Sequence, residues 1–370
     1  MKAKILALFF TCKNGLETWN KVGSLKREIK PYEELSNYFK EIYFFTYGNE
    51  KDLTFPLPEN IKVFPKKGNM PSILYSFFLP FLYRKELKKV DIIKTNQMSG
   101  SWTALLVKLF FKTRVVLRCG YEWLNVIEKE KKPFWKKVFV YCVSKVAYHC
   151  SDKIIFTSKK DKEYAKKVFN IEEKKVTIIP NYIDTDVFKN LALQKQDRVI
   201  FVGRLAREKN LLNLAKACSD LKIQLCLIGQ GDQKEQLKQV NQAIDFKGSI
   251  PNDKLPLEIN KSLIFCLPSF YEGCPKALLE AMACGLACVA SNVEGIKEII
   301  NEDNGVLTDT DELSIKEGIQ RLLNNETLRK KIGEKARETI EDRFSLNKII
   351  EKELKLYIEF YEKKSNYLLS

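Results

Sequence analysis

Two glutamates, Glu272 and Glu280, lie eight positions apart in the sequence EGCPKALLE. The first stands in a turn rich in Gly and Pro directly after the apolar run 263–267. The second lies in an apolar helical pattern of about residues 276–283, which Gly285 ends. A buried carboxylate needs hydrogen-bond partners, and the hydroxyls of a sugar or a ribose would supply them. The alternative is that Glu280 pairs with a nearby Lys or Arg, which we favour less.

The start of the same predicted helix offers backbone amides to an anion. The first N–H groups of a helix have no partner inside it and carry the positive end of the helix dipole. A phosphate group is therefore a natural ligand for this turn.

A second candidate anion site follows the apolar run that ends at Val202. Gly203 permits a close backbone approach, and Arg204 and Lys209 flank the turn before a helix that we expect to begin near Lys209. A planar guanidinium and a compact ammonium suit a diphosphate. The alternative is a solvated basic loop. A third turn, Gly229-Gln230-Gly231, lacks the third glycine of a dinucleotide fingerprint and is equally well a structural turn.

Short apolar runs that alternate with helical patterns must position these side chains. Such runs predict strands of parallel sheets covered on both faces. We expect strands at Ile5–Phe10, Ile42–Thr46, Ile61–Phe64, Asp91–Thr95, Val115–Arg118, Lys153–Thr157, Val176–Ile179, Arg198–Val202, Gln224–Ile228, Ile244–Phe246, Leu263–Leu267, Ala287–Ala290 and Val306–Leu307.

Two such series in 370 residues predict two doubly wound α/β domains with ligands at the carboxyl ends of the strands. We place a first domain at residues 1–184 and a second domain at 185–343. Residues 180–196, without clear periodicity, are interpreted as the linker. A terminal helix, about residues 344–370, can pack back on the first domain.

The charge of the chain is concentrated in its first half. Residues 1–180 hold 35 Lys and Arg against 18 Asp and Glu, whereas the remainder holds 28 against 29. A field of this kind attracts phospholipid head groups, a lipid-linked diphosphate or nucleic acid. The plainer alternative is that lysines only aid solubility, but the neutral second half argues against a uniform lysine bias.

Cysteine and histidine usage points to a reducing compartment without a zinc site. The ten cysteines form no C-x-x-C pair and stand mostly in apolar contexts, and His149 is the single histidine. We interpret His149 as a structural or surface residue. The apolar run at the N-terminus is too short for a typical signal peptide, so a buried first strand is the better interpretation. No stretch approaches the ~20 apolar residues of a membrane span.

At this point the residues resemble a known family. The stretch EGCPKALLEAMACGLACVASNVEGIKEII resembles the E-x7-E region of retaining glycosyltransferases of family four, which have the GT-B fold of two Rossmann-like domains facing across a cleft. VGRLAREKN, LIGQGDQKEQL and FKGSIPNDKLP match further segments of that family. The resemblance is specific over about residues 198–310 and looser over residues 1–180.

The resemblance implies a role for each matching residue of the second domain. Arg204 and Lys209, next to Gly203, would hold the donor diphosphate, and Glu280 would bind the ribose hydroxyls. Glu272 and the amides of Gly273 and Cys274 would face the donor sugar. The amides near Ala277 and Leu278 would contact the phosphate, and the loop 248–250 with Ile250 would contact the nucleobase.

In the first domain the pattern departs from the family. The family often has a glycine-rich loop after the first strand, where this chain offers only Gly15, and a histidine beside the donor sugar. The corresponding strand end here has Arg118 and Glu122 and no histidine. These three residues are candidates for the acceptor side by position only.

The expected function is transfer of a sugar from a nucleotide-diphosphate donor to a glycan or lipid-linked acceptor in bacterial surface glycan synthesis. Front-face displacement with retention, no metal and no cofactor are implied, with Arg204, Lys209 and Glu272 as the catalytic set. Removing one donor to a growing charge typically costs ~10²–10³ in rate.

The first domain also contains apolar stretches edged by cations. In residues 73–82 aliphatic and aromatic side chains crowd together before Arg84 and Lys85, and lysines mix with aromatic residues over 123–137. Such stretches can lie in a membrane interface, although a helix buried against the first sheet is the interpretation that we favour for 73–82. We expect a cytoplasmic protein attached peripherally to the anionic inner leaflet.

Three rival functions remain open at this stage. A sugar-nucleotide epimerase would share the two-domain fold but needs acid and base groups in the cleft and no acceptor. A basic nucleic-acid-binding protein fits the aromatic and lysine mixture of residues 121–141 but leaves a buried Glu280 unexplained, so we expect no nucleic-acid partner. A non-catalytic relative is disfavoured by the intact set Arg204, Lys209, Glu272 and Glu280.

Overall fold

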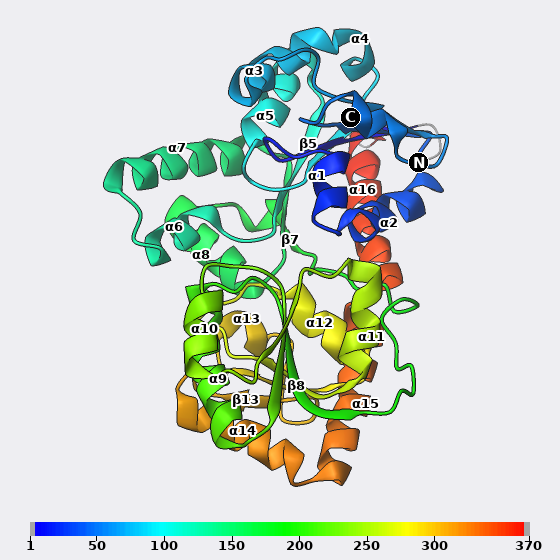
Figure 1. The fold of residues 1–370 in the computed structure, drawn as a ribbon. Coiled ribbons are helices and arrows are strands. Elements are labelled where there is room, and N and C mark those ends of the chain that lie inside the picture. Colours follow the sequence, from blue (N-terminus) through cyan, green and yellow to red (C-terminus); the bar gives the residue numbers. More distant parts are fainter. Residues whose placement is uncertain (1–3, 366–370) are drawn as a thin grey trace. The chain divides into compact units, whose positions relative to one another are not determined.

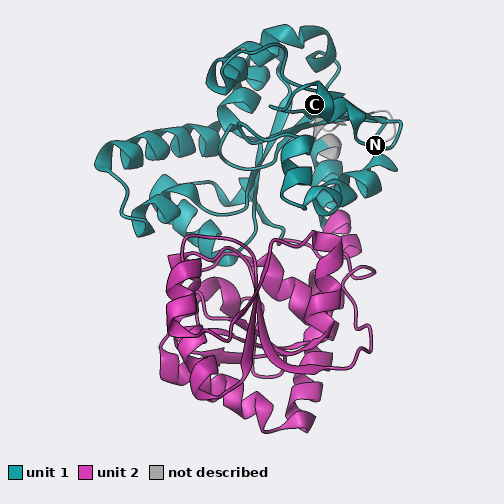
Figure 2. Cartoon of the chain, in the orientation of Figure 1, with its two compact units in different colours: residues 1–179, 352–370 teal, residues 180–351 magenta. Residues whose placement is uncertain are grey.

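The structure is a computed structural model that describes the backbone of residues 4–365 and the side chains of residues 4–360. The chain divides into two compact units (Figure 2). Unit 1 comprises residues 1–179 and 352–370, and unit 2 comprises residues 180–351. Each unit has its own sheet and is described by itself.

Unit 1 contains a seven-stranded parallel sheet in the order β3-β2-β1-β4-β5-β6-β7 (Figure 1). Its strands are β1 Ile5–Phe9, β2 Glu41–Phe45, β3 Ile61–Phe64, β4 Ile92–Thr95, β5 Arg114–Cys119, β6 Lys153–Phe156 and β7 Val176–Ile178. Its helices are α1 Leu16–Lys21, α2 Leu25–Ser36, α3 Ser72–Leu82, α4 Arg84–Leu87, α5 Ser101–Phe111, α6 Trp123–Lys129, α7 Phe134–Cys150 and α8 Lys159–Phe169, with short 3-10 turns at Glu50–Thr54 and Glu173–Lys175.

Unit 2 contains a six-stranded parallel sheet in the order β10-β9-β8-β11-β12-β13. Its strands are β8 Gln196–Val202, β9 Gln224–Ile228, β10 Asp245–Gly248, β11 Ser262–Leu267, β12 Ala287–Ser291 and β13 Val306–Thr308. Its helices are α9 Leu211–Asp220, α10 Lys234–Val240, α11 Leu255–Asn260, α12 Lys276–Ala283, α13 Glu294–Lys297, α14 Glu312–Leu323 and α15 Glu326–Arg343, with 3-10 turns at Arg207–Lys209 and Asn252–Lys254. The last helix, α16 Leu346–Ser365, runs from unit 2 into unit 1.

The predicted α/β class and its parallel sheets are confirmed. Each apolar run forms a strand, and the central strands are buried on both faces, as in β1, where all five side chains are buried. The edge strands β3, β7 and β10 are only partly covered. Ends differ by one or two residues, most visibly at β10, where a shift in register follows Phe246 and carries the strand to Gly248. Strand ends are the least constrained part of an apolar pattern because the terminal residues are only partly covered.

The order of strands reverses once in each sheet, between β1 and β4 in unit 1 and between β8 and β11 in unit 2. At such a point the connecting helices leave to opposite faces of the sheet. A crevice therefore opens at the carboxyl ends of the two central strands, which is where open α/β sheets bind ligands.

The segment 180–195 is not a loose connection, because it packs on unit 2. Ile183 and Phe188 are buried in the core of unit 2, and Ile183 forms a bridge with Ser345. The guanidinium of Arg337 on α15 donates to the carbonyls of Phe188 and Thr185. The predicted linker therefore begins where the two units meet, at residue 180, and its length packs on unit 2.

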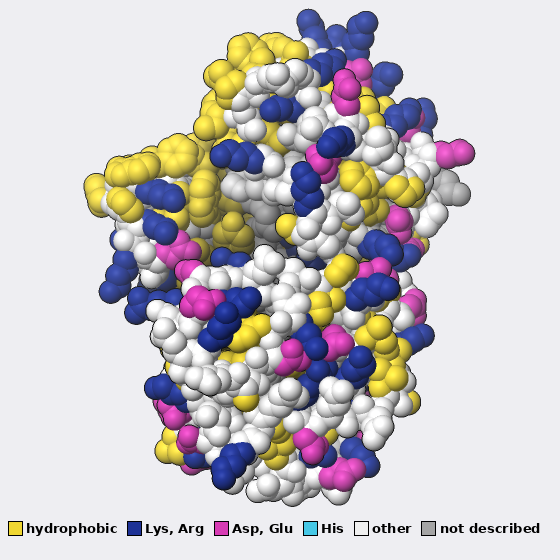
Figure 3. Space-filling model, viewed as in Figure 1, with side chains coloured by type: hydrophobic (Ala, Val, Ile, Leu, Met, Phe, Trp, Pro, Cys, Tyr) yellow, Lys and Arg dark blue, Asp and Glu magenta, His cyan; other side chains and the backbone are white. Residues whose placement is uncertain are grey.

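The favoured interpretation of residues 73–82 as a helix buried against the sheet is also wrong in part. α3 buries Tyr75, Ser76, Leu79 and Pro80, but the other side of the helix is exposed. Figure 3 shows hydrophobic side chains gathered over this region of unit 1. Apolar composition alone cannot distinguish a helix covered on all sides from one covered on a single face.

Most of the cysteines are buried, whereas the histidine lies at the surface. Seven of the ten cysteines are buried, Cys12 is half-buried, and Cys142 and Cys150 are exposed. His149 is exposed near the end of α7, with Nδ1 2.8 Å from the carbonyl oxygen of Lys145. Among residues 4–365, no helix combines the length and apolarity that a membrane crossing requires.

Candidate functional site

The loops that follow β8 and β9 pack directly on each other through glycines. Gly229 has a φ of +139°, and a Cβ added there would lie 1.8 Å from the carbonyl oxygen of Gly203. A Cβ on Gly231 would lie 2.1 Å from the carbonyl oxygen of Leu205. The backbones of the two turns thus pack directly on each other at the carboxyl edge of unit 2. This packing alone requires the glycines of the G-x-G turn, whether or not the turn contacts a ligand.

Lys209 and Glu272 meet at this edge. The Lys209 ammonium lies 2.6 Å from Oε1 of Glu272, and the hydroxyl of Ser269 donates to the same oxygen at 2.7 Å. The two charged side chains are only 17% and 11% exposed. The residues from the two strongest motifs of the sequence therefore form one partly buried ion pair.

A short polar anchor positions Lys209. The chain forms a 3-10 turn over Arg207–Lys209, then Asn210 takes a left-handed φ of 55° and α9 begins at Leu211. The Asn210 amide donates to the carbonyls of Pro268 and Thr310 at 3.0 and 2.7 Å. The predicted helix start near Lys209 is therefore two residues early, because Asn210 needs a conformation that helices exclude.

Arg204 does not converge with Lys209 in this structure. Its side chain is 76% exposed and pairs with Glu208 at 2.7 Å. The backbone amide of Phe270 binds the Glu208 carbonyl at 2.9 Å, which ties this turn to the loop after β11. Arg204 is thus an exposed cation at the rim, free of tertiary packing that would fix its guanidinium.

The loop before α12 presents backbone groups at the same edge. Gly273 packs so closely on α13 that a Cβ on Gly295 would lie 2.2 Å from the Gly273 carbonyl oxygen. The buried Cys274 is held through its carbonyl, which accepts from the Asn181 amide at 2.6 Å. Ala277 and Leu278 lie in the first turn of α12, where amides have no partner inside the helix.

Glu280 lies on α12 with only 2% of its surface exposed. Its Oε1 accepts a hydrogen bond from the Asn252 side chain at 2.8 Å. Lys276, one helical turn earlier, lies over the ring of Tyr182 at 5.6 Å. The amide of Asn252 thus supplies one of the partners that a buried carboxylate needs.

The loop after β10 joins this arrangement through its backbone. Gly248 has a φ of +67°, and its carbonyl accepts from the Gly229 amide at 2.7 Å. Ile250 packs against the core of unit 2, and Pro251 leads into the turn that holds Asn252. The predicted nucleobase loop therefore lies next to the G-x-G turn and to the partner of Glu280.

The candidates in unit 1 lie on the edge of a different sheet. Gly15 follows β1 at the start of α1, and a Cβ there would meet the Asp52 carboxylate at 2.4 Å. Asp52 is fully buried and accepts from the Glu17 amide at 2.9 Å and from the Thr46 hydroxyl at 2.5 Å. A glycine at position 15 is required for this packing whatever the loop binds.

Arg118 and Glu122 flank the end of β5. Arg118 is half-buried, and its amide donates to the Thr95 hydroxyl at 3.0 Å. Glu122 is fully buried and caps α6 by accepting from the Asn125 amide at 2.7 Å, while the Tyr148 hydroxyl lies 3.3 Å away. Burial raises the pKa of Glu122 to about 7. Glu122 thus serves as an internal helix cap in this structure.

Asn252, Ser269 and Asn210 are site residues that the sequence analysis missed. Each acts by orienting a charged side chain or a turn, and single polar residues of this kind give no periodic signal. Asn252 stands in the segment FKGSIPNDKLP, after the end of a predicted strand. This position could have identified it as a site residue, because ligands bind at the carboxyl ends of the strands. Within the described part of the chain, no group of three or more His, Cys, Asp or Glu is placed to hold a metal ion.

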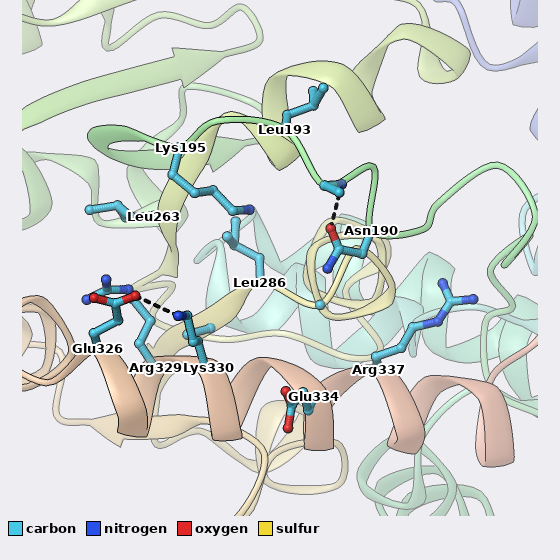
Figure 4. Close-up of a pocket in the computed structure, with 13 residues that line it drawn as sticks. Asn190, Leu193, Lys195, Leu263, Leu286, Glu326, Arg329, Lys330, Glu334 and Arg337 are labelled. Atoms are coloured by element: carbon cyan, nitrogen blue, oxygen red, sulfur yellow. Dashed lines mark hydrogen bonds and ion pairs between the residues drawn. The ribbon is translucent and has the colours of Figure 1, made fainter.

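A pocket of about 590 Å³ lies elsewhere in unit 2, between α15 and the segment 190–195 (Figure 4). It is lined by Leu263 and Ala287, at the starts of β11 and β12, so it opens at the opposite edge of the sheet. Arg337 there donates to main-chain carbonyls. We interpret this pocket as a gap left where the segment 190–195 packs on α15, separate from the candidate site at the carboxyl edge of the sheet.

Two family descriptions match this chain. "Glycosyl transferases group 1" matches residues 182–339, and "Glycosyltransferase Family 4" matches residues 40–187. Together they cover most of both units, and the first contains every candidate residue of unit 2.

Curated relatives align over most of their length. An uncharacterized glycosyltransferase of Methanocaldococcus jannaschii is 28% identical over 91% of this chain and 95% of its own. The UDP-Gal:alpha-D-GlcNAc-diphosphoundecaprenol alpha-1,3-galactosyltransferase of Escherichia coli is 27% identical over 75% of this chain and 77% of its own.

Solved structures share the fold. The sucrose-phosphate synthase of Thermosynechococcus elongatus superposes with a TM-score of 0.79 at 19% sequence identity, covering 97% of this chain and all of the other. An identity this low supports the fold and nothing finer.

Proposed function

The chain belongs to the group 1 glycosyltransferases, family 4, with an α/β fold of the GT-B type, and we propose that it moves a sugar from a nucleotide-diphosphate donor to a lipid-linked glycan acceptor with retention of configuration. The observation that carries the proposal is the gathering of Lys209, Glu272, Glu280 and the start of α12 at one sheet edge of unit 2.

The donor would lie across the carboxyl ends of β8 and β11. Glu280 would accept hydrogen bonds from the ribose hydroxyls, with Asn252 holding the carboxylate in place. The base would lie by Ile250, and Glu272 with the amides of Gly273 and Cys274 would face the sugar.

The diphosphate charge would be neutralised by Lys209, Arg204 and the first-turn amides near Ala277 and Leu278. Lys209 has three donors, and Glu272 uses one of them at 2.6 Å. Arg204 is exposed and paired only at the surface, so a rotation of its side chain brings it to an anion at little cost. A donor site of this composition has its own positive charges and works without a metal.

The reaction that fits these groups is a front-face displacement. The bond between the anomeric carbon and the diphosphate oxygen breaks, and the acceptor oxygen bonds to that carbon from the same face. The leaving diphosphate takes the acceptor proton. Lys209, Arg204 and the helix amides would stabilise the charge that grows on the leaving group.

The acceptor side belongs to unit 1 in this proposal. The Escherichia coli relative bears a diphosphoundecaprenol acceptor in its name, and the basic first half of this chain suits a lipid-linked diphosphate at an anionic inner leaflet. Gly15, Arg118 and Glu122 are the acceptor-side candidates, and Glu122 is buried and caps α6.

Thermal unfolding against a panel of nucleoside diphosphates and nucleotide sugars, with excess chelator, tests the donor site. A ligand at ~100 times its dissociation constant adds about 2.7 kcal/mol, a rise of several degrees in Tm for units of this size. We expect one nucleotide family to give this rise without metal, and Glu280→Ala to abolish it.

Glu302→Ala provides the matched control, because Glu302 is an exposed carboxylate in a turn of unit 2. The control should keep the full rise in Tm. No rise with any nucleotide in the wild-type protein would refute the donor site, and a rise only in the absence of chelator would refute metal independence. Analysis of the anomeric configuration of the product then decides between retention and inversion.

A further inference from the structure

Three helices of unit 1 share an apolar exposed side. α3 exposes Ile73, Leu74, Phe77, Phe78, Phe81 and Leu82, each at least 37% accessible. These positions follow the i, i+4, i+8 spacing of one helical stripe, while the buried residues of α3 lie on the other side. The exposed stripe therefore follows the regular helical spacing of α3 along its whole length.

The stripe continues onto α5 and α7. The Phe81 ring of α3 lies 5.1 Å from the Phe110 ring of α5, and α5 packs against α7. On α7 the most exposed large hydrophobic side chains are Phe134 at 80% and Trp135 at 70%, followed by Val146 and Phe139. We call the exposed sides of α3, α5 and α7 together the apolar face. Figure 3 shows it as yellow side chains over the places that Figure 1 labels α3 and α7.

The apolar face is too large for an ordinary surface. Seven aromatic rings on it are half exposed or nearly so, which leaves on the order of 700 Å² of ring surface in water. The largest apolar patch of a typical monomer is about 300–600 Å². Leaving this much apolar surface in water is unfavourable, and an exposed patch of this size marks an interaction site.

The charges on the same helices are all of one sign. α3 has no charged residue, α5 has Lys108, and α7 has Lys136, Lys137 and Lys145. None of the three helices contains Asp or Glu. Beside α3 stand the exposed Arg84 and Lys85. An occupant that is apolar inside and anionic at its border complements this face.

We propose that the apolar face docks unit 1 onto an anionic lipid bilayer, with the aromatic rings of α3 and α7 between the acyl chains and the lysines at the head groups. Phe and Trp next to Lys are the residues that settle at a membrane interface. The inference rests on the proposed function in one respect: docking would bring the enzyme to a lipid-linked acceptor, which lies in the bilayer. Its geometry is independent of the donor site.

Sedimentation with vesicles tests the proposal directly. The full chain is mixed at low salt with vesicles of phosphatidylcholine and phosphatidylglycerol, or of phosphatidylcholine alone. We expect strong binding to the anionic vesicles, weaker binding to the neutral ones, and a loss of binding as salt is raised. No binding to anionic vesicles would overturn the proposal.

Two double variants locate the contact. Phe134→Ser/Trp135→Ser on α7 and Phe77→Ser/Phe81→Ser on α3 should each lower the vesicle affinity about tenfold or more. The matched control is Leu257→Ser/Leu313→Ser, since both leucines are exposed on unit 2, at 46% and 61%. The control should bind like the wild type, and apolar-face variants that also bind like the wild type would overturn the assignment.

Two further measurements separate this inference from its alternatives. Lys209→Ala should lose sugar transfer yet bind vesicles normally, so failure of the donor site and failure of docking give different results. Light scattering without lipid tests a second copy as the occupant. Dimers that the α7 double variant dissociates, together with no vesicle binding, would overturn the proposal in favour of a protein interface.

Discussion

Lys209 and Glu272 form an ion pair at the edge of unit 2 where we propose the donor site. The pair is largely excluded from water, at 17% and 11% exposure, and Ser269 donates to the carboxylate as well. When one member of a partly buried ion pair is removed, the charge of the other member is left unbalanced. Glu272 thus positions the ammonium, which has further donors for an incoming phosphate.

We expect Lys209→Ala to lower turnover by ~10²–10³, because a cation that stabilises the leaving charge is lost. The fold should persist, since the Ser269 hydroxyl still donates to Glu272. Steady-state kinetics with the donor found by thermal unfolding measures the effect.

Lys330→Ala is the control for this variant. Lys330 pairs with Glu326 at 2.7 Å on α15, and its side chain is 71% exposed. Its loss should leave turnover near that of the wild type. Equal activity of the two variants would remove Lys209 from the catalytic set.

Glu122 gives unit 1 a pH dependence of its own. Burial raises its pKa to about 7 against hydrogen bonds from the amides of Asn125 and Leu124. Burial likewise raises the pKa of the nearby Asp161 and keeps Tyr148 and Cys119 protonated. Between about pH 4.5 and 7 the folded state retains a proton on Glu122 that the unfolded chain releases. The stability contributed by Glu122 is thus full at low pH and is lost as pH rises towards 7.

Glu122→Gln should flatten this slope, because the amide oxygen still caps α6 but does not ionise. The wild type should lose on the order of 3 kcal/mol from this residue across the window, and the variant none of it. Urea unfolding at about pH 5 and about pH 8 measures the difference. Glu130→Gln, at an exposed position, is the control and should keep the wild-type slope.

At the scale of elements, the turns after β8 and β9 show why glycine spacing matters. A methyl group on Gly229 would lie 1.8 Å from the Gly203 carbonyl oxygen, which is backbone and cannot rotate away. Gly248 also has a positive φ, but nothing lies within 4 Å of its Cβ position. Comparing the two glycines therefore separates the cost of steric overlap, present only at Gly229, from the cost of a positive φ, present at both.

We expect Gly248→Ala to cost about 1–2 kcal/mol of unfolding free energy, the penalty of the left-handed conformation. Gly229→Ala should cost clearly more, because the two sheet-edge turns must move apart. Urea unfolding of both variants gives the comparison. Equal destabilisation would show that the turns are not in the close contact described above.

The elements themselves were predictable from the sequence, and their exposed faces were not. Every predicted strand exists, and α12 spans the predicted 276–283, because buried strands and capped helices follow from local apolar patterns. The apolar face of α3 was misjudged, since the same residues would suit a buried helix. Asn252 was missed because it meets Glu280 only after β10, α11 and α12 have folded together.

The terminal helix α16 is fixed to unit 1 by a buried ion pair. Both oxygens of Glu353 lie 2.7 Å from the Lys94 ammonium on β4, with exposures of 7% and 3%. The Tyr357 hydroxyl donates to Glu353 at 3.2 Å, and the Tyr32 ring lies 5.3 Å from the ammonium. Such a pair positions a helix more than it stabilises it.

Glu353→Ala should destabilise unit 1 by about 3–5 kcal/mol, because it leaves the Lys94 charge buried alone. The double variant Lys94→Met/Glu353→Leu should recover most of this loss, since no buried charge remains. Denaturant unfolding measures both. A double variant as unstable as the single one would mean that Glu353 acts through packing and not through charge.

At the scale of the whole molecule, the chain crosses from unit 1 to unit 2 near residue 180 and returns within α16 near residue 352. Ile349 and Ile350, in the part of α16 that belongs to unit 2, are buried, and Tyr357 in the later part packs against Phe39 of unit 1. Residues 352–360 of α16 therefore complete the core of the first sheet. A loss at the C-terminus should be felt by the N-terminal unit.

A chain that ends at Glu351 tests this consequence. Unit 1 should unfold at a lower temperature, because Lys94 loses Glu353 and the surface under Tyr357 is opened to water. Unit 2 keeps all of its strands and the Lys209, Glu272 and Glu280 groups, so the nucleotide that stabilises the full chain should still raise one thermal transition by the same amount. Calorimetry with and without nucleotide separates the two transitions. If truncation abolished the nucleotide effect, the donor site would depend on unit 1, and the assignment of that site to unit 2 alone would be wrong.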